Sequence, residues 1–221
     1  MLPQTHLTAF WPVYELVVMY DIDELERRVH ACTACTLSET RTNAVPGEGS
    51  RTADLMFIGE GPGFYEDRDG KPFVGPAGKF LEELLASISL TREDVYITNM
   101  VKCRPPNNRD PLPGEIEACR PYLDRQLEII EPKVLVTLGR HSFAKFFPGE
   151  TISRARGKER PWNGITLYPV YHPAAALHNP KLRSTIEDDF SRLPSLVESA
   201  TVQEAGPAEV ADETKQLSLF D

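Results

Sequence analysis

Short apolar runs alternate with helix-forming segments along this chain of 221 residues, and few folds accommodate that order. Helix-forming segments lie at residues 21–31, 77–88, 115–130, 141–147 and 181–197, and the apolar runs at 54–58, 95–98, 134–138 and 167–171. Continuous apolar runs of this length are typical of parallel strands that are buried on both faces. The order predicts a three-layer α/β fold with a mainly parallel sheet.

Polar side chains follow three of these apolar runs. Glu60 comes after the first run, Asn99 after the second and His172 after the fourth. In a parallel α/β sheet, ligands bind beyond the carboxyl ends of the strands. Each residue alone could be a helix cap or a satisfied hydrogen-bonding group. Together they favour a functional site at that edge of the sheet.

The four cysteines of the chain form a close pair and two distant singles. Cys32 and Cys35 make a Cys-x-x-Cys pattern, and Cys103 and Cys119 follow much later. One four-thiolate site would use all of them. Such a soft donor set suits a [4Fe–4S] cluster or a structural zinc ion. Two disulfides are the alternative, but nothing in the sequence indicates export.

Charge and hydropathy limit the compartment and the partners. The formal net charge of −9 is concentrated in an acidic tail at 198–221, whereas residues 99–183 are basic. The basic region is compatible with nucleic acid, and equally with a solvated charged face. Residues 1–20 form an apolar extension of unclear role that lacks the basic start and cleavage site of a signal peptide. The sequence contains no run of about 18 apolar residues, so no membrane span is expected. We expect a monomer in the cytoplasm, associated with the nucleoid, because thiols remain available for a cluster in that compartment.

The glycine-rich segment 59–63 is a weak candidate for a phosphate loop, because it lacks the lysine and hydroxyl of that motif. Its continuation is more distinctive. Together with three later segments, it closely resembles the family 4 uracil-DNA glycosylases, which are iron–sulfur enzymes of bacteria and archaea. The resemblance covers residues 25–195 and rests on Glu66-Asp67, Gly70-Lys71-Pro72-Phe73-Val74-Gly75, Ile97-Thr98-Asn99, Lys102-Cys103-Arg104-Pro105-Pro106, Asn108-Arg109 and His172-Pro173.

The resemblance implies a four-stranded parallel sheet between helices and a [4Fe–4S] cluster on all four cysteines. It implies a monofunctional glycosylase that hydrolyses the N-glycosidic bond of deoxyuridine in DNA, leaves an abasic site and initiates base excision repair. Two alternatives stay open. One is a glycosylase for a broader range of deaminated bases, and the other is a non-catalytic, cluster-bearing DNA-binding module.

The chemistry of base excision suggests roles for three residues. The nucleotide must be flipped out of the stack into a pocket. Phe73, on a glycine-flanked loop, is the candidate platform for the flat ring, and a core aromatic is its alternative. The amide of Asn99 can both donate to and accept from the edge of uracil that differs from cytosine. His172, as a neutral imidazole, would donate to uracil O2 while negative charge develops there.

The resemblance supplies the remaining pocket roles. It places Glu66 against uracil C5, where it would exclude the methyl group of thymine; a helix-end charge is the alternative. It assigns Glu60 and the backbone around Gly61 to the attacking water, and Gly59 and Gly63 to the uracil pocket. The better-known uracil glycosylases have an aspartate at the place of Gly61, where it orients the attacking water. Because glycine has no side chain for that task, we expect catalysis to depend on His172 and electrostatics more than on a general base.

Contacts to DNA are expected from two segments. The segment 172–177 resembles the minor-groove loop of the family, and Leu177 is its candidate wedge for the gap that the flipped base leaves. Arg154, Arg156 and Lys158 form a basic run suited to phosphates. Alternation along an exposed strand edge is an equally good interpretation of that run.

The C-terminal segment is expected to lie outside the catalytic domain, which we place at residues 21–197. Residues 198–214 have a composition typical of a disordered linker. The chain then ends in a pentapeptide that resembles the motif by which bacterial proteins bind the DNA sliding clamp, with Gln216, Leu217, Leu219 and Phe220 as the contact residues.

Overall fold

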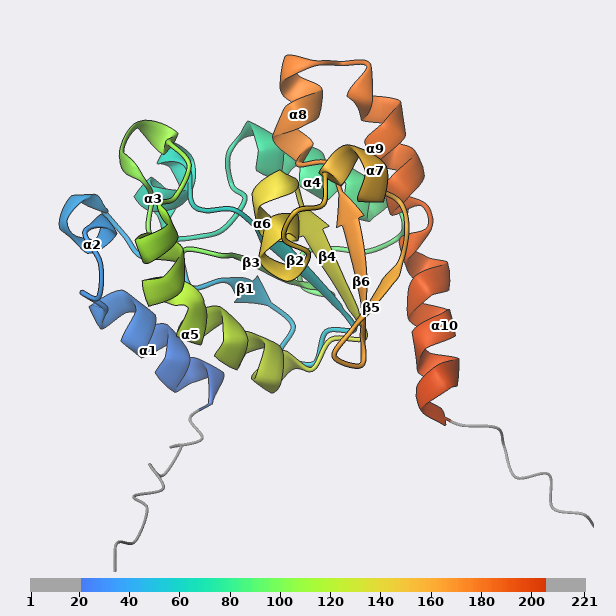
Figure 1. Ribbon diagram of the computed structural model, residues 1–221, viewed down its shortest axis with the longest axis horizontal. Helices are drawn as coiled ribbons and strands as arrows, with labels where there is room; N and C mark the ends of the chain where they lie inside the picture. Colours follow the sequence, from blue (N-terminus) through green and yellow to red (C-terminus); the bar gives the residue numbers. More distant parts are fainter. Residues whose placement is uncertain (1–20, 206–221) are drawn as a thin grey trace, which may run out of the picture.

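The computed structural model describes residues 21–205, so the 1–20 extension and the 216–220 peptide lie outside the described residues. A six-stranded sheet forms the centre, in the order β1-β3-β2-β4-β6-β5 (Figure 1). The strands are β1 Glu48–Gly49, β2 Leu55–Gly59, β3 Tyr96–Asn99, β4 Val134–Leu138, β5 Arg160–Trp162 and β6 Ile165–Val170.

The four inner strands are parallel to one another, and they are the four that the apolar runs predict. The expectation of a four-stranded sheet is incomplete, because β1 and β5 add an antiparallel strand at each edge. These edge strands of two and three residues are too short to show a periodic pattern. Pro161 lies within β5, where an edge position tolerates its missing N–H group.

Helices cover both faces of the sheet, which confirms the three-layer arrangement. Successive side chains of a strand point to opposite faces. Met56 and Ile58 accordingly pack in one core with α1 (Ile22–Ala31), α5 (Pro113–Ile130) and α6 (Arg140–Phe146). Leu55 and Phe57 pack in the other core, with α4 (Pro76–Ser87), α9 (Leu182–Phe190) and α10 (Leu193–Ala205). Figure 1 shows the two helical layers on either side of the sheet.

The C-terminal helix differs from the expectation. The predicted helix 181–197 is broken into α9 and α10, and α10 continues to Ala205. Residues 198–205 are therefore helical, where a disordered linker was expected. The reason is tertiary: Leu193, Leu196, Val197 and Ala200 follow helical spacing and pack on the core beneath the sheet.

Four short helices lie in segments that the sequence patterns leave as loops. They are α2 (Leu37–Thr40), α3 (Phe64–Asp69), α7 (Ile152–Ala155) and α8 (Pro173–His178), and a 3₁₀ turn occupies Pro106–Asn108. Two of them, α3 and α8, stand at the carboxyl end of the sheet, where they frame the pocket described below. No helix among residues 21–205 has the length and apolar character that crossing a membrane requires.

Candidate active site

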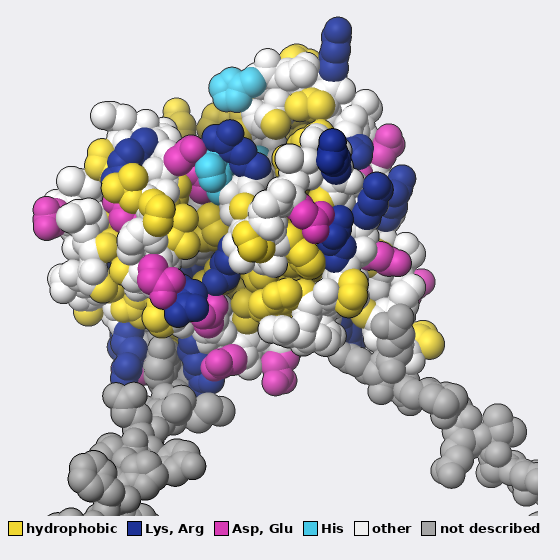
Figure 2. All heavy atoms as spheres, in the orientation of Figure 1, with side chains coloured by type: hydrophobic (Ala, Val, Ile, Leu, Met, Phe, Trp, Pro, Cys, Tyr) yellow, Lys and Arg dark blue, Asp and Glu magenta, His cyan; other side chains and the backbone are white. Residues whose placement is uncertain are grey.

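A pocket of about 730 Å³ opens at the carboxyl ends of the parallel strands. It brings together the three strand-end residues and the glycine-loop residues that the sequence singles out. In Figure 2, hydrophobic, basic and histidine side chains gather around the hollow between the α3 region and α8. The predicted site residues that line it are Glu60, Gly61, Gly63, Glu66, Phe73, Asn99, His172 and Leu177.

Gly59 ends β2 and lies directly beneath the pocket. A side chain at this position would overlap Oδ1 of Asn99 and would lie 2.8 Å from Cζ of Phe73. The absence of a side chain therefore lets the amide and the aromatic ring meet over the strand end. Gly59 shapes the pocket by leaving room for both groups.

His172 caps the N-terminus of α8, and its hydrogen bond fixes the tautomer of the ring. The backbone N–H of Ala174 donates to Nδ1 of His172 at 3.1 Å. Burial lowers the pKa of His172 to about 4, while the charge of Glu66 opposes that shift. The ring is thus neutral at pH 7 with its proton on Nε2, which makes Nε2 a hydrogen-bond donor.

Phe73 lies on the loop between α3 and α4 and is 5 % exposed. Its ring stacks on His172, with centroids 5.5 Å apart and planes 23° from parallel. The backbone of Phe73 is left-handed, with φ of +53°, a conformation that a bulky residue adopts only where its surroundings hold it.

Two charged side chains hold this loop from opposite sides. The carboxylate of Glu66 accepts hydrogen bonds from the N–H groups of Gly63 (3.1 Å), Val74 (3.0 Å) and Gly75 (2.9 Å). The guanidinium of Arg92 donates to the carbonyl of Phe73 at 3.0 Å and to that of Pro72. Glu66 therefore does more than place a charge at a helix end, because its oxygens close the loop that carries Phe73.

The same loop rests on α4 at Gly78, and this contact leads to a prediction. A Cβ at Gly78 would overlap the carbonyl of Phe73, a backbone atom that cannot move without the loop. Gly78→Ala is expected to displace Phe73 and to lower uracil excision in a single-turnover assay at least tenfold. Gly114→Ala in α5 is the matched control, because no atom lies within 4 Å of a Cβ there. Equal activity of the two variants would contradict the prediction.

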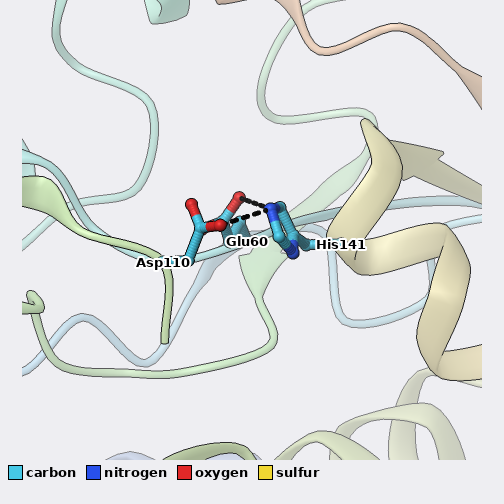
Figure 3. Close-up of side chains that lie close together, drawn as sticks. All are labelled: Glu60, Asp110 and His141. Carbon is cyan, nitrogen blue, oxygen red and sulfur yellow. Dashed lines mark ion pairs between the residues drawn. The ribbon is translucent and has the colours of Figure 1, made fainter. Parts of the chain in front are cut away.

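Glu60 lies in a cluster with Asp110 and His141 (Figure 3). Nε2 of His141 is 3.7 Å from a carboxylate oxygen of Glu60 and 3.2 Å from one of Asp110. Burial raises the pKa of Glu60, His141 and Arg140 oppose the shift, and Asp110 adds to it. Arg140 joins the cluster, because its Nε donates to Nε2 of His141 at 2.8 Å and its Nη2 lies 3.1 Å from a carboxylate oxygen of Asp110.

Gly61 follows Glu60 and packs against the segment that leads from β3 to Cys103. A Cβ at this position would lie 2.7 Å from Cγ2 of Val101, which is fully buried. An aspartate introduced at position 61 would therefore disturb packing as well as chemistry.

Sequence reasoning missed His141, Asp110 and Arg92. A signal for His141 existed, since it stands just after the third parallel strand, as Glu60, Asn99 and His172 stand after the others. Asp110 and Arg92 gave no such signal. Both lie in loops. Asp110 reaches His141, which is far along the chain, and Arg92 contacts the backbone carbonyl of Phe73.

The four cysteines line one cavity between α1, α2 and α5. All four are free thiols, so the structure does not support the two-disulfide alternative. Three hydrogen bonds reach the sulfurs: Arg41 Nη1 donates to Cys103 Sγ at 3.0 Å, the N–H of Lys102 to Cys119 Sγ at 3.2 Å, and the N–H of Ala34 to Cys32 Sγ at 3.5 Å. Burial raises the pKa of the Cys119 thiol to about 11. Four cysteines around one cavity, with N–H donors to their sulfurs, fit a four-thiolate site.

Lys102 connects this cavity to the pocket. Its side chain is 1 % exposed, and its Nζ donates to the carbonyl of Asn99 (2.7 Å), to Thr98 Oγ1 (2.7 Å) and to Gln126 Oε1 (2.6 Å). Burial lowers its pKa to about 7, with the Cys119 thiolate acting in the opposite direction. One residue thereby contacts the Cys119 sulfur through its backbone and the Asn99 backbone through its side chain.

Of the residues expected to contact DNA, the structure leaves three exposed and engages one in an ion pair within the fold. Leu177 lies on α8 at the pocket rim and is 50 % exposed. Arg154 on α7 and Lys158 after it are also exposed. Arg156 is instead engaged within the fold, 3.5 Å from a carboxylate oxygen of Asp189. The strand-edge alternative does not describe these three residues, because Arg154 is helical and Arg156 and Lys158 lie in the loop between α7 and β5.

Comparisons with known proteins agree with this site. A family model described as the uracil DNA glycosylase superfamily matches residues 46–192. A type-4 uracil-DNA glycosylase of Sulfurisphaera tokodaii is 51 % identical over 188 residues, covering 80 % of this chain and 86 % of the relative. Proteins of the same name from Saccharolobus solfataricus and Archaeoglobus fulgidus are each 50 % identical, covering 83 % and 80 % of this chain and 90 % and 94 % of the relatives. The chain therefore belongs to the uracil DNA glycosylase superfamily and, within it, to the type-4 uracil-DNA glycosylases.

Proposed function

We propose that this protein hydrolyses the N-glycosidic bond of deoxyuridine in DNA and leaves an abasic site, the first step of base excision repair. The observation that carries the proposal is the meeting, in one pocket, of a neutral His172 with a donor at Nε2, the amide of Asn99 and the ring of Phe73. Family membership supports the same reaction. We place the enzyme in the reducing cytoplasm, on nucleoid DNA, as a monomer.

Recognition precedes chemistry in this mechanism. The uracil nucleotide leaves the stack and enters the pocket, and Leu177 fills the gap in the duplex. The uracil ring packs against Phe73, and the Asn99 amide pairs with N3–H and O4, a pattern that cytosine cannot match. Glu66 lies beside C5 and excludes the methyl group of thymine. The burial of Asn99, which is 2 % exposed, makes a mismatched pairing costly.

Cleavage of the bond then separates charge. The sugar becomes cation-like while negative charge grows on the uracil ring, and Nε2–H of His172 donates to O2, where that charge collects. The donor is neutral and fixed by Ala174, so it needs no reorganisation during the reaction. Glu60, which lies beside His141 at the pocket wall, orients the water that attacks the sugar, together with the backbone around Gly61.

We infer that Cys32, Cys35, Cys103 and Cys119 hold a [4Fe–4S] cluster. Such a cluster would supply a rigid cross-link between the N-terminal segment and the loop that leads to Asn99. The four sulfurs in one cavity and the N–H donors from Arg41 and Lys102 support this inference. A brown protein that absorbs near 400 nm is expected, and a colourless protein that contains zinc would contradict the cluster.

The activity is tested by single-turnover excision from oligonucleotides that carry U·G, U·A or unpaired uracil. We expect excision from all three by the wild type and a loss of at least a hundredfold in Asn99→Ala with unchanged thermal unfolding. Parallel substrates with hypoxanthine or xanthine separate a uracil enzyme from one with broader base specificity. Wild-type protein with its cluster intact that binds DNA but releases no base would instead identify a non-catalytic binding module.

A second candidate function concerns the C-terminal peptide, which lies outside the described residues. Residues 216–220 place apolar side chains at the end of a polar segment, as in peptides that dock into grooves. We infer that they bind the bacterial DNA sliding clamp. Deletion of residues 215–221 is expected to abolish capture by the immobilised clamp and to leave excision intact. Ser218→Ala should retain binding, and capture of the truncated protein would refute the inference.

A further inference from the structure

Within residues 21–205, exposed apolar side chains of large size are few, and three of the five line the pocket. Among the described residues they are Phe64, Tyr65, Leu112, Leu177 and Val202. Phe64 (53 % exposed), Tyr65 (44 %) and Leu177 (50 %) all line the pocket. Leu177 comes from α8, whereas the two aromatic residues come from α3. The uracil pocket is therefore flanked by an aliphatic side chain and, separately, by an aromatic pair.

The aromatic pair has the composition of a surface that stacks nucleobases. The two rings lie edge to face, with centroids 5.5 Å apart. Arg104 lies over the Phe64 ring at 5.2 Å and Arg68 over the Tyr65 ring at 5.3 Å. Aromatic rings and arginine planes on which bases stack are the common means of holding single-stranded nucleic acid.

The pair does not stabilise the core of the fold, yet its position is fixed. Neither ring belongs to the two buried clusters. The helix that carries them is anchored on its other side, where Asp67 accepts from the N–H groups of Thr42 (2.8 Å) and Asn43 (3.3 Å). Tyr65 also lies over Gly75, since a Cβ there would be 3.1 Å from its Cδ2. An exposed aromatic surface on a rigid support indicates a binding role.

We propose that Phe64 and Tyr65 form a stacking platform for the unpaired base next to the uracil in the same strand. This proposal rests on the proposed function of the pocket. In a duplex, the neighbouring base keeps its partner and its stack, and Leu177 fills the gap. In a single strand, the neighbouring base is free, and the rings replace the stacking that it lacks.

The test compares the Phe64→Ala/Tyr65→Ala double variant with wild type on three oligonucleotides. These are single-stranded DNA with one uracil, the same strand with abasic spacers on both sides of the uracil, and a U·G duplex. Leu112→Ala is the control, because Leu112 is equally exposed (53 %) and lies outside the pocket lining. Tyr65→Phe keeps the ring and should behave as wild type. Binding is measured by fluorescence anisotropy with a hydrolysis-resistant 2′-fluorinated uridine, and excision under single-turnover conditions.

We expect the double variant to lose about tenfold in affinity for the single strand, the effect of one stacked base, and several times less for the duplex. Spacers should weaken wild-type binding to the level of the variant and should not weaken the variant further. Equal losses on the single strand and the duplex, or a loss that persists with spacers, would overturn the platform. If the wild type excises nothing but shows these binding differences, the platform stands and the proposed activity fails.

Discussion

Replacing His172 by alanine is expected to slow single-turnover uracil excision by about 10²- to 10³-fold, the usual effect of removing one donor from a developing anion. The donor at Nε2 is lost, and α8 loses the cap that Nδ1 provides for the N–H of Ala174. His30→Ala on the exposed face of α1 is the control. An excision rate within about threefold of wild type would show that another group stabilises the anion.

The protonation of His172 tests whether the imidazole is neutral, as the donor role requires. Its pKa of about 4, below the ordinary 6.5, follows from burial. We expect an NMR titration of its ring to show no protonation between pH 7 and pH 5. Because the unfolded chain binds the proton more tightly, this group reduces the stability of the fold as the pH falls from about 6.5 toward 4. His172→Ala should remove that part of the pH dependence, and a midpoint near 6.5 would contradict the neutral donor.

Lys102→Met is expected to destabilise the protein by about 3 kcal/mol, as for other losses from buried charged networks. The methionine matches the lysine in length but leaves the carbonyl of Asn99 and the oxygens of Thr98 and Gln126 without their shared donor. Excision should fall as well, because the backbone of Asn99 loses the contact that positions it.

The control for this prediction is Lys133→Met, which removes a surface ion pair with Asp54 at 3.0 Å. Pairs of that kind contribute about 0–1 kcal/mol. Thermal unfolding and the absorbance near 400 nm are followed together, under anaerobic conditions, so that unfolding and cluster loss are separated. Equal stability of the two variants would mean that Lys102 is replaceable by an apolar side chain.

The sequence predicts the elements whose patterns are local and long. The four inner strands and helices such as 115–130 were identified within a few residues, since burial on both faces or on one face leaves a clear signature. The edge strands β1 and β5 were missed because pairing to a neighbour, rather than their own two or three residues, defines them. The helical part of 198–205 was missed because packing on the sheet overrides a weak local preference.

The candidate site divides in the same way. Glu60, Asn99 and His172 were found because they follow strands, and the resemblance to a family added Glu66 and Gly61. Supporting residues such as Arg92 and Lys102 act through single contacts to distant backbone atoms. Nothing in the local sequence marks such a contact, and only the folded chain shows which carbonyl a buried cation reaches.

The carboxylate of Glu66 has a consequence for how base selectivity can evolve. Its oxygens accept three backbone hydrogen bonds that shape the loop of Phe73, and we place the same side chain beside uracil C5. A substitution that made room for a methyl group would also release the loop. Acceptance of thymine would then require a second change that restores the loop. A single mutation is therefore poorly suited to make this enzyme excise thymine from undamaged DNA.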